Sequence, residues 1–345
     1  MNIDPGIYVR REVFLAEREA VFSTTWQLLG PVAKLTERRS YVATEIAGMK
    51  VFAVRSNDGV LRAFRNVCRH RGARLLPEGE GTCGPIRCPY HQWQFSDAGV
   101  LLKAPWYGEE PGFDMADWPL EPICVAEWRG LVFVAIRPAL GLIEQLGDTV
   151  AEMAAEPMET YLPVRTERMI FEANWKIYTD NFVEGLPIPG IHPAFHAAIE
   201  FEEFSTTAHD GMVRMTAPPK EGLWYRGKWL WMWPNWTLSL FGGGMNTSRI
   251  NPLDEGRTEL IYNFYFDDSL DEAARERTIQ GTLGVVREDF EVCVETQKNY
   301  ASGGYHPGPL SPRHEKGVAY FQARVAESLG MTESLGMTES LGMTA

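Results

Sequence analysis

Cys68-Arg-His-Arg-Gly-Ala-Arg-Leu75 and Cys88-Pro-Tyr-His-Gln-Trp-Gln-Phe95 are the two stretches that decide the fold of the first half of the chain. Each begins with a cysteine that is followed within three residues by a histidine, and 17 residues separate the first histidine from the second cysteine. Gly72 and Pro89 favour tight loops, because glycine tolerates unusual backbone angles and proline stiffens a turn. Two thiols and two imidazoles can therefore converge on one small metal centre.

These four side chains match the ligand set of a Rieske [2Fe-2S] centre, in which two thiolates hold one iron and two imidazoles hold the other. They are Cys68, His70, Cys88 and His91. The alternative is a structural zinc site, but zinc motifs more often contain C-x2-C or H-x3-5-H pairs. We therefore expect an iron–sulfur cluster. The other cysteines are expected to be buried small hydrophobic residues, and they are Cys83, Cys124 and Cys293.

The residues around the two motifs favour β structure. Between residues 40 and 138, strand-like segments are separated by the turn signals Ser56-Asn-Asp-Gly59 and Ser96-Asp-Ala-Gly99. A G-x-G-x-x-G pattern at 79–84 lies between the ligand pairs and precedes a proline rather than a helix, so we exclude a dinucleotide site there. Electrons from NAD(P)H must then arrive through a separate protein.

Both stretches, together with Asp97, Gly99 and Pro105, resemble the Rieske domain of the ring-hydroxylating oxygenase α subunits, which are Rieske-type non-haem iron enzymes. Respiratory Rieske proteins cross-link their cluster loops through two further cysteines. The corresponding positions here are Ala73 and Tyr90, so the resemblance is to the oxygenase branch. It implies a partner reductase or ferredoxin, O2 and a small organic substrate.

The second half mixes helical and strand-like segments. Residues 141–158 and 174–185 are predicted to be helical, and 224–241 and 259–266 are aromatic strand-like runs. A long helix follows, with a capping-box pattern at Ser269 and Glu272 and apolar residues at three- and four-residue steps thereafter. Those apolar residues are Ile279, Leu283, Val286, Phe290 and Cys293.

We therefore expect an α+β protein with two main domains. Residues 1–39 form an entry segment whose helix packs on the catalytic domain, 40–140 an all-β Rieske domain, 141–326 a catalytic domain, and 327–345 a repetitive tail. The tail repeats Glu-Ser-Leu-Gly-Met-Thr three times, which is too short to bury a core. The resemblance implies a helix-grip (START-like) catalytic domain and a homotrimer.

A mononuclear iron site is expected in the catalytic domain. Asn174-Trp-Lys176, Asp180-Asn-Phe-Val-Glu-Gly185 and His192-Pro193 resemble the catalytic signature of the same oxygenases, most closely the choline, carnitine and betaine oxygenases. In that family two histidines and one carboxylate hold Fe(II). Asp289 is the expected carboxylate, because it lies beside the apolar stripe of the long helix, where a carboxylate needs a partner. His192 is one expected histidine; its alternative role is to cap a short helix.

The second histidine is missing. The family places it five residues before His192, where this chain has Pro187. Three explanations are open: His196, four residues after His192, supplies a rearranged ligand; the iron site has been lost; or the codons for Leu186-Pro187 contain a reading error that conceals Tyr-His. The rest of the signature is intact, which favours the first and third explanations.

Glu184 and Asp180 are predicted to serve the site indirectly. In the resembled family, the acid at Glu184 bridges the Rieske histidine of one subunit to the iron site of its neighbour, and its alternative here is a solvated helix residue. Asp180 lies one helical turn earlier, which suits a residue that orients the ligands.

An aromatic run bears on the substrate. Five tryptophans fall between residues 224 and 236, with Tyr225 and Phe241 beside them. Indole faces attract quaternary ammonium groups, but alternating tryptophans on a strand more often form core. The run leaves an arene, an N-methylated amine and a terpenoid open as substrates.

Composition excludes several classes of protein. The 33 basic and 46 acidic residues give a net charge of −13, so nucleic acid is not an expected partner. No apolar stretch approaches the length of a membrane span, and the N-terminus lacks the apolar region of a secretory signal, so we expect a cytoplasmic protein without a membrane partner.

We therefore expect the terminal oxygenase component of a Rieske system, a mono- or dioxygenase that contains a [2Fe-2S] cluster and mononuclear Fe(II). It would hydroxylate or oxidatively demethylate its substrate. The alternative is an electron-transfer or binding protein without the mononuclear iron, which Pro187 allows.

Overall fold

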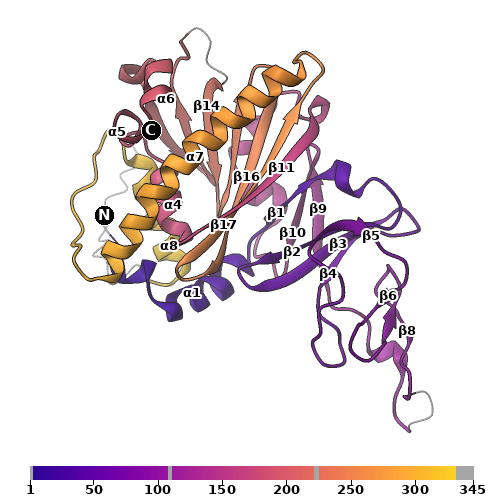
Figure 1. Ribbon diagram of the computed structural model, residues 1–345. Helices are drawn as coiled ribbons and strands as arrows, with labels where there is room; N and C mark the ends of the chain where they lie inside the picture. Colours follow the sequence, from indigo (N-terminus) through magenta and orange to yellow (C-terminus); the bar gives the residue numbers. More distant parts are fainter. Residues whose placement is uncertain (1–2, 108–110, 221–224, 332–345) are drawn as a thin grey trace.

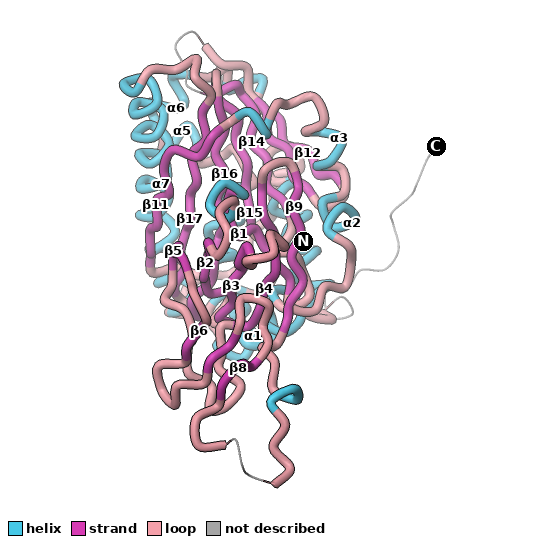
Figure 2. Tube along the Cα trace, turned by 90° about the vertical axis from the view of Figure 1, so that its right-hand side faces the viewer, coloured by secondary structure: helices cyan, strands magenta, loops and turns pink. Residues whose placement is uncertain are grey.

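The computed structural model describes residues 3–107, 111–220 and 225–331. Two antiparallel sheets of seven strands each form the body of the molecule, and a small three-stranded sheet projects from one end (Figure 1, Figure 2). The C-terminal repeat lies outside the described residues from position 332 onward. None of the described helices is long and apolar enough to cross a membrane.

The first sheet contains the strands of the expected Rieske domain in the order β1-β10-β9-β4-β3-β2-β5, and the small sheet has the order β6-β7-β8. The predicted turn at 96–99 is confirmed: the Gly99 N–H donates to the Ser96 carbonyl at 3.0 Å. Gly99 has φ of +85°, and a Cβ there would come within 2.5 Å of the Phe64 ring, so the turn requires glycine. The strands are β1 (Gln27–Pro31), β2 (Ser40–Ile46), β3 (Met49–Arg55), β4 (Leu61–Arg65), β5 (Gly79–Thr82), β6 (Ile86–Arg87), β7 (Gln94–Phe95), β8 (Leu101–Lys103), β9 (Pro122–Trp128) and β10 (Leu131–Ala135).

One cysteine prediction in this sheet is wrong. Cys83 and Cys293 are buried as expected, but Cys124 is exposed. Cys124 follows the buried Ile123 on β9, and successive side chains of a strand point to opposite faces. The alternation therefore turns Cys124 toward solvent.

The second sheet has the order β11-β17-β16-β15-β14-β13-β12, and the long helix α7 (Glu272–Ala301) crosses one of its faces (Figure 1). This is the α+β, helix-grip arrangement expected for the catalytic domain. The strands are β11 (Leu162–Phe171), β12 (Ser205–His209), β13 (Met212–Thr216), β14 (Tyr225–Met232), β15 (Trp236–Phe241), β16 (Gly244–Asp254) and β17 (Arg257–Phe266).

Helix α7 holds the expected apolar stripe against the sheet. Ile279, Leu283, Val286 and Cys293 are buried, and Phe290 stacks on Phe171 with ring centroids 4.2 Å apart. The start of the helix differs from the prediction. Asp271, not Ser269, is the N-cap, because its carboxylate accepts the Ala274 N–H at 2.7 Å, whereas Ser269 hydrogen bonds to Asp267.

The remaining helices are short. The segment predicted to be helical at 141–158 forms two pieces, because Gly147 has φ of +51° and a Cβ there would come within 2.5 Å of the Asp210 carbonyl oxygen. The helices are α1 (Arg11–Glu17), α2 (Leu142–Leu146), α3 (Thr149–Glu152), α4 (Trp175–Phe182), α5 (Ile188–Ile191), α6 (Pro193–Ala198) and α8 (Lys316–Ser328), with a π-helical turn at Arg18–Phe22 and 3-10 turns at Pro5–Tyr8, Val32–Leu35, Met115–Asp117, Met158–Thr160 and Phe201–Glu203.

The N-terminal segment joins both halves of the molecule. Strand β1 pairs with β10 in the first sheet, so the expected boundary at residue 40 falls after a strand that already belongs to that sheet. The preceding helix contacts the catalytic domain through a buried ion pair in which Glu17 Oε1 lies 2.6 Å from Lys176 Nζ. The Trp175 indole also donates to Glu17 at 3.0 Å.

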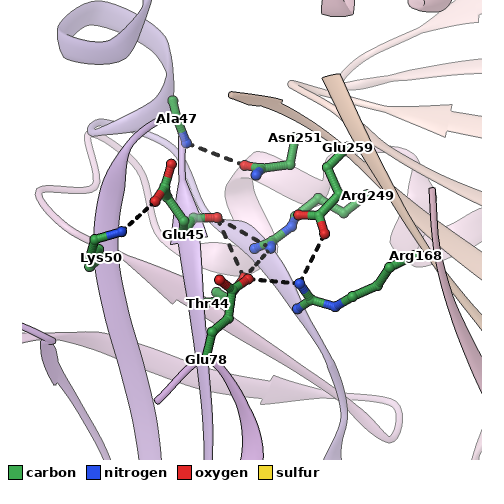
Figure 3. Close-up of polar contacts among 9 residues, drawn as sticks. All are labelled: Thr44, Glu45, Ala47, Lys50, Glu78, Arg168, Arg249, Asn251 and Glu259. Atoms are coloured by element: carbon green, nitrogen blue, oxygen red, sulfur yellow. Dashed lines mark hydrogen bonds and ion pairs between the residues drawn. The ribbon is translucent and has the colours of Figure 1, made fainter. Parts of the chain in front are cut away.

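Charged and polar contacts connect the two large sheets (Figure 3). Arg249 of β16 is 2% exposed and donates from Nη2 to Thr44 Oγ1 of β2 at 2.6 Å. Arg168 of β11 bridges Glu78 at 2.7 Å and Glu259 at 3.0 Å. Since Glu78 follows the first cluster motif in the chain, this contact ties the end of that loop to the catalytic domain.

Candidate functional site

The two cluster motifs fold into loops with the same backbone hydrogen bonds. The Cys68 N–H donates to the carbonyl five residues later at 2.8 Å, and the N–H four residues later donates back to Cys68 at 3.0 Å. Cys88 repeats the pattern at 2.8 and 3.1 Å. The returning donors, Gly72 and Gln92, both have positive φ, at 72° and 62°. The sequence thus builds two matched loops, each presenting a cysteine and a histidine.

The side chains of these loops fit a Rieske cluster. Cys68 and Cys88 are both buried and unpaired by disulfide, and the rings of His70 and His91 lie 4.5 Å apart between centroids. Nδ1 of both histidines is buried without a hydrogen-bond partner among the described residues. Such orphaned nitrogens cost about 1–3 kcal/mol each, a cost that ligation to iron would remove. All four predicted ligands therefore come together.

The cluster site is buried at its cysteines, and aromatic rings pack around its histidines. Burial raises the pKa of Cys68 to about 11, so its thiolate needs a metal to form at neutral pH. Trp93 stacks on His70 at 5.0 Å, and the Tyr107 hydroxyl lies 2.8 Å from His70 Nε2. Tyr90 is 60% exposed and its ring packs 3.7 Å from that of His91 between centroids. The histidine edge of the site is therefore the edge near solvent.

A cavity lies within the catalytic domain, bordered by α4, α5, α7 and the sheet. His192, Asp289, Glu184 and Pro187 all line it. Half of the remaining lining residues are aromatic, and they are Tyr178, Phe182, Phe195, Phe204, Tyr225, Trp229 and Tyr262.

His192 and Asp289 meet in the wall of this cavity. Both are buried, and His192 Nε2 lies 3.0 Å from Asp289 Oδ1. Asn181 Nδ2 donates to the same carboxylate oxygen at 2.7 Å, and Glu288 Oε2 lies 2.6 Å from His192 Nδ1. The neighbouring positions 288 and 289 of α7 thus hold one imidazole between two carboxylates.

Burial and the neighbouring charged groups have opposite effects on the pKa values of His192 and Asp289. Burial lowers the pKa of His192, but the hydrogen bonds and charges of Asp289 and Glu288 outweigh it and raise the pKa overall. Burial raises the pKa of Asp289, against the contacts with His192 and Asn181 that lower it. An imidazole with a carboxylate partner on its other nitrogen is the arrangement that orients a metal-binding histidine.

His192 and Asp289 fit two positions of a mononuclear iron site, and no described residue is grouped with them to fill the third. Pro187 lies in the cavity wall, and proline has no donor for a metal. His196 does not line the cavity, and its ring packs 5.3 Å from Phe201 between centroids. Within residues 3–107, 111–220 and 225–331 no three histidine, cysteine or acidic side chains are grouped to hold one ion.

Glu184 connects this cavity with a second one. It lines both the aromatic cavity and a polar cavity of about 520 Å³ that also contains Asp180 and Glu315. Burial raises the pKa of Glu184 to about 8, and the charges of Glu315 and Asp180 add to the effect. Glu184 is thus placed between the two cavities.

The hydrogen-bond partners of Asp180 are not the iron ligands that it was predicted to orient. Its Oδ2 accepts from the Tyr8 hydroxyl at 2.6 Å and from Gln322 Nε2 at 3.4 Å, and burial raises its pKa to about 7. The contacts that orient His192 and Asp289 come instead from Glu288 and Asn181. Neither role was predicted from the sequence; the available signal was the position of Glu288 beside Asp289 and of Asn181 beside Asp180 in the chain.

The aromatic run divides between cavity and core. Tyr225 and Trp229 of β14 line the cavity. The alternate residues Trp231 and Trp233 are buried near α8, where Trp231 packs on Phe321 with centroids 5.4 Å apart. Trp236 of β15 packs on Phe133, and Trp224 lies outside the described residues.

Comparison with known proteins gives consistent results. Residues 25–116 match the Rieske [2Fe-2S] domain family, and residues 202–331 match the ring hydroxylating alpha subunit (catalytic domain) family. The chain is 30% identical to the carnitine monooxygenase oxygenase subunit of Escherichia coli K12, over 94% of this chain and 93% of that protein. It is 25% identical to the chloroplastic choline monooxygenase of Beta vulgaris, over 93% of this chain and 76% of that one.

Solved structures agree with these matches. A quaternary ammonium Rieske monooxygenase that oxidises carnitine superimposes with a TM-score of 0.85 at 27% identity, covering 95% of each chain. Naphthalene 1,2-dioxygenase superimposes with a TM-score of 0.79 at 17% identity, covering 96% of this chain and 93% of that one, which shows a shared fold.

Proposed function

The chain belongs to the family of Rieske-type ring-hydroxylating oxygenase α subunits, and from this premise we propose that it oxidises a small N-methylated ammonium compound. It is the terminal oxygenase of a Rieske system, which uses O2 and electrons from a partner reductase. An N-methylated substrate is favoured over an arene because relatives of this chain are named for carnitine and choline, and because the cavity has an aromatic wall.

One observation carries this function: a single chain holds two loops with orphaned imidazole nitrogens and a separate buried His192–Asp289 pair at an aromatic cavity. When bound, the cluster supplies single electrons and Fe(II) supplies O2 activation. Cys68, His70, Cys88 and His91 would hold the cluster, while His192 and Asp289 would hold the iron, with Glu288 fixing the ring of His192. Pro187 has no donor atom and would supply no third ligand.

The positions of the two centres support a homotrimer. In both views the cluster loops, next to β6 and β8, lie at the opposite end of the molecule from α5 and α6 (Figure 1, Figure 2). An electron therefore has no short path within one chain, and the acceptor would be a neighbouring copy. Head-to-tail contacts of this kind close into a ring when the rotation permits.

Glu184 is the residue we assign to the subunit crossing. It lines both cavities, so it can contact a histidine of a neighbouring chain on one side and the iron site on the other. Asp180, held by Tyr8, would support this position from the polar cavity.

The test is the iron content of the anaerobically purified and reconstituted protein, together with turnover using a surrogate reductase. An oxygenase should contain the two irons of the cluster and one further ion, and should consume O2 with an N-methylated amine present. A protein that holds only the cluster irons and never oxidises a substrate would instead be an electron carrier. A colourless, zinc-containing first domain would overturn the assignment entirely.

A further inference from the structure

The charges of the aromatic cavity point to one subclass of ammonium compound. Its acidic lining residues are Glu184 and Asp289, and the carboxylate of Glu288 lies behind His192. No lysine or arginine is present among the lining residues in the part of the chain that the structure describes. An iron ion on His192 and Asp289 would offset the charge of Asp289.

Three rings form a corner in the wall. Phe195 of α6 meets Trp229 at 5.4 Å and Tyr225 at 5.9 Å between centroids, with interplanar angles of 85° and 76°. Tyr225 and Trp229 lie 5.5 Å apart at 61°. Rings that meet edge to face present their faces in different directions, and a quaternary ammonium group is attracted to such faces.

We propose that the cavity selects a compact organic monocation, an N-methylated ammonium compound that carries no carboxylate. This deepens the proposed function and rests on it, because it concerns the substrate of the same site. The ammonium group lies against Trp229, Tyr225 and Phe195. A short neutral tail, such as an alcohol, can hydrogen bond with the hydroxyls of Ser239 and Thr282, which also line the cavity.

A zwitterion fits the same cavity less well. The carboxylate of an amino-acid betaine would be removed from water, and the described lining residues include no lysine or arginine to pair with it. A buried carboxylate without such a partner is strongly disfavoured. Discrimination against the zwitterion therefore comes from the lack of a basic side chain in the described wall, while discrimination against an uncharged analogue comes from the rings.

The experiment measures binding calorimetrically to the oxidised, reconstituted holoenzyme without reductase, so that it does not depend on turnover. The probes are choline, its uncharged isostere 3,3-dimethylbutan-1-ol, and the zwitterions glycine betaine and L-carnitine. We expect choline to bind at least tenfold more tightly than each of the others. Equal or tighter binding of a zwitterion or of the isostere, or no binding of choline, would overturn the proposal.

Substitutions of single residues test whether the three rings bind the ammonium group. Trp229→Leu should weaken choline binding by roughly tenfold and change binding of the isostere less, and Trp229→Phe should keep part of the affinity. Trp118→Leu in the first domain, where Trp118 is 36% exposed, is the matched control and should bind choline like the wild type. If Trp229→Leu does not fold, the comparison of probes on the wild-type protein still decides.

Failure of this inference can be told apart from failure of the proposed function. Preferential turnover of a zwitterion would refute the inference and leave the oxygenase assignment intact. Tight binding of choline without any oxidation would refute the assignment and leave the inference intact.

Discussion

Removal of the Glu288 carboxylate should weaken iron binding although Glu288 is not an expected ligand. Its Oε2 lies 2.6 Å from His192 Nδ1, and its side chain is 43% exposed, so the Glu288→Ala variant should fold normally. Without this acceptor the imidazole can rotate, and its other nitrogen is a weaker base toward a metal. Loss of a partner of this kind typically lowers metal affinity by about 10–100-fold, or roughly 1.4–2.7 kcal/mol.

The assay is competition for Fe(II) with a chromogenic chelator under anaerobic conditions, with cluster absorbance as an internal check. Glu288→Gln keeps an acceptor oxygen but loses the charge, and should fall between the alanine variant and the wild type. Glu291→Ala is the matched control, since Glu291 is exposed on the same helix. Iron affinity of Glu288→Ala equal to that of Glu291→Ala would refute the role assigned to the carboxylate and weaken the case for His192 as a ligand.

Further perturbations separate the parts of the molecule. Glu184→Gln should leave the cluster spectrum intact and slow substrate turnover sharply, because the proposed bridge between subunits is lost; equal turnover removes it from the mechanism. Pro187→His should raise Fe(II) affinity by at least tenfold in the same chelator assay, since it supplies the third ligand, and an unchanged affinity would place that position outside the iron site. Lys176→Met strands the buried carboxylate of Glu17 and should lower the free energy of unfolding in urea by about 3–5 kcal/mol, whereas the double variant with Glu17→Gln should recover much of it. Burial raises the pKa of Asp180 from 3.8 to about 7, so the folded chain keeps a proton that the unfolded chain has lost; stability should fall as pH rises through that window, and Asp180→Asn should flatten the dependence in urea titrations across pH.

The cluster site could be predicted from the sequence because all of its ligands are local. Each loop carries its cysteine and histidine within four residues, so the chemistry is visible without knowledge of the tertiary structure. Cys124 shows the opposite case: its exposure depends on which face of β9 packs inward, and this alternation was not read from the sequence.

The second site was predicted only in part, because it is assembled from distant segments. The periodicity of the long helix identified Asp289 as an acid beside the apolar stripe. It gave no sign that Glu288, whose side chain is 43% exposed, also contacts His192, 96 residues away in the chain. The contact of Asn181 with Asp289 was not predicted, because an uncharged amide between Asp180 and Glu184 gives no separate sign of a role at the site. Only the structure shows which residues of the aromatic run line the cavity and which form the core. Trp229 lines the cavity, whereas Trp231 packs in the core.

The contacts of His192 explain how the cavity can fold although a third iron ligand is missing at position 187. Both ring nitrogens face carboxylates, at 2.6 and 3.0 Å, so each has a hydrogen-bond partner without a metal. The buried acid Asp289 then has a partner whether or not iron is bound, which removes the penalty of an unpaired buried charge. The packing of the cavity therefore does not need a histidine at position 187. If His192 and Asp289 hold Fe(II), the ion would compete with any proton on an imidazole whose pKa the two acids raise, and it would have fewer protein ligands than in the resembled family.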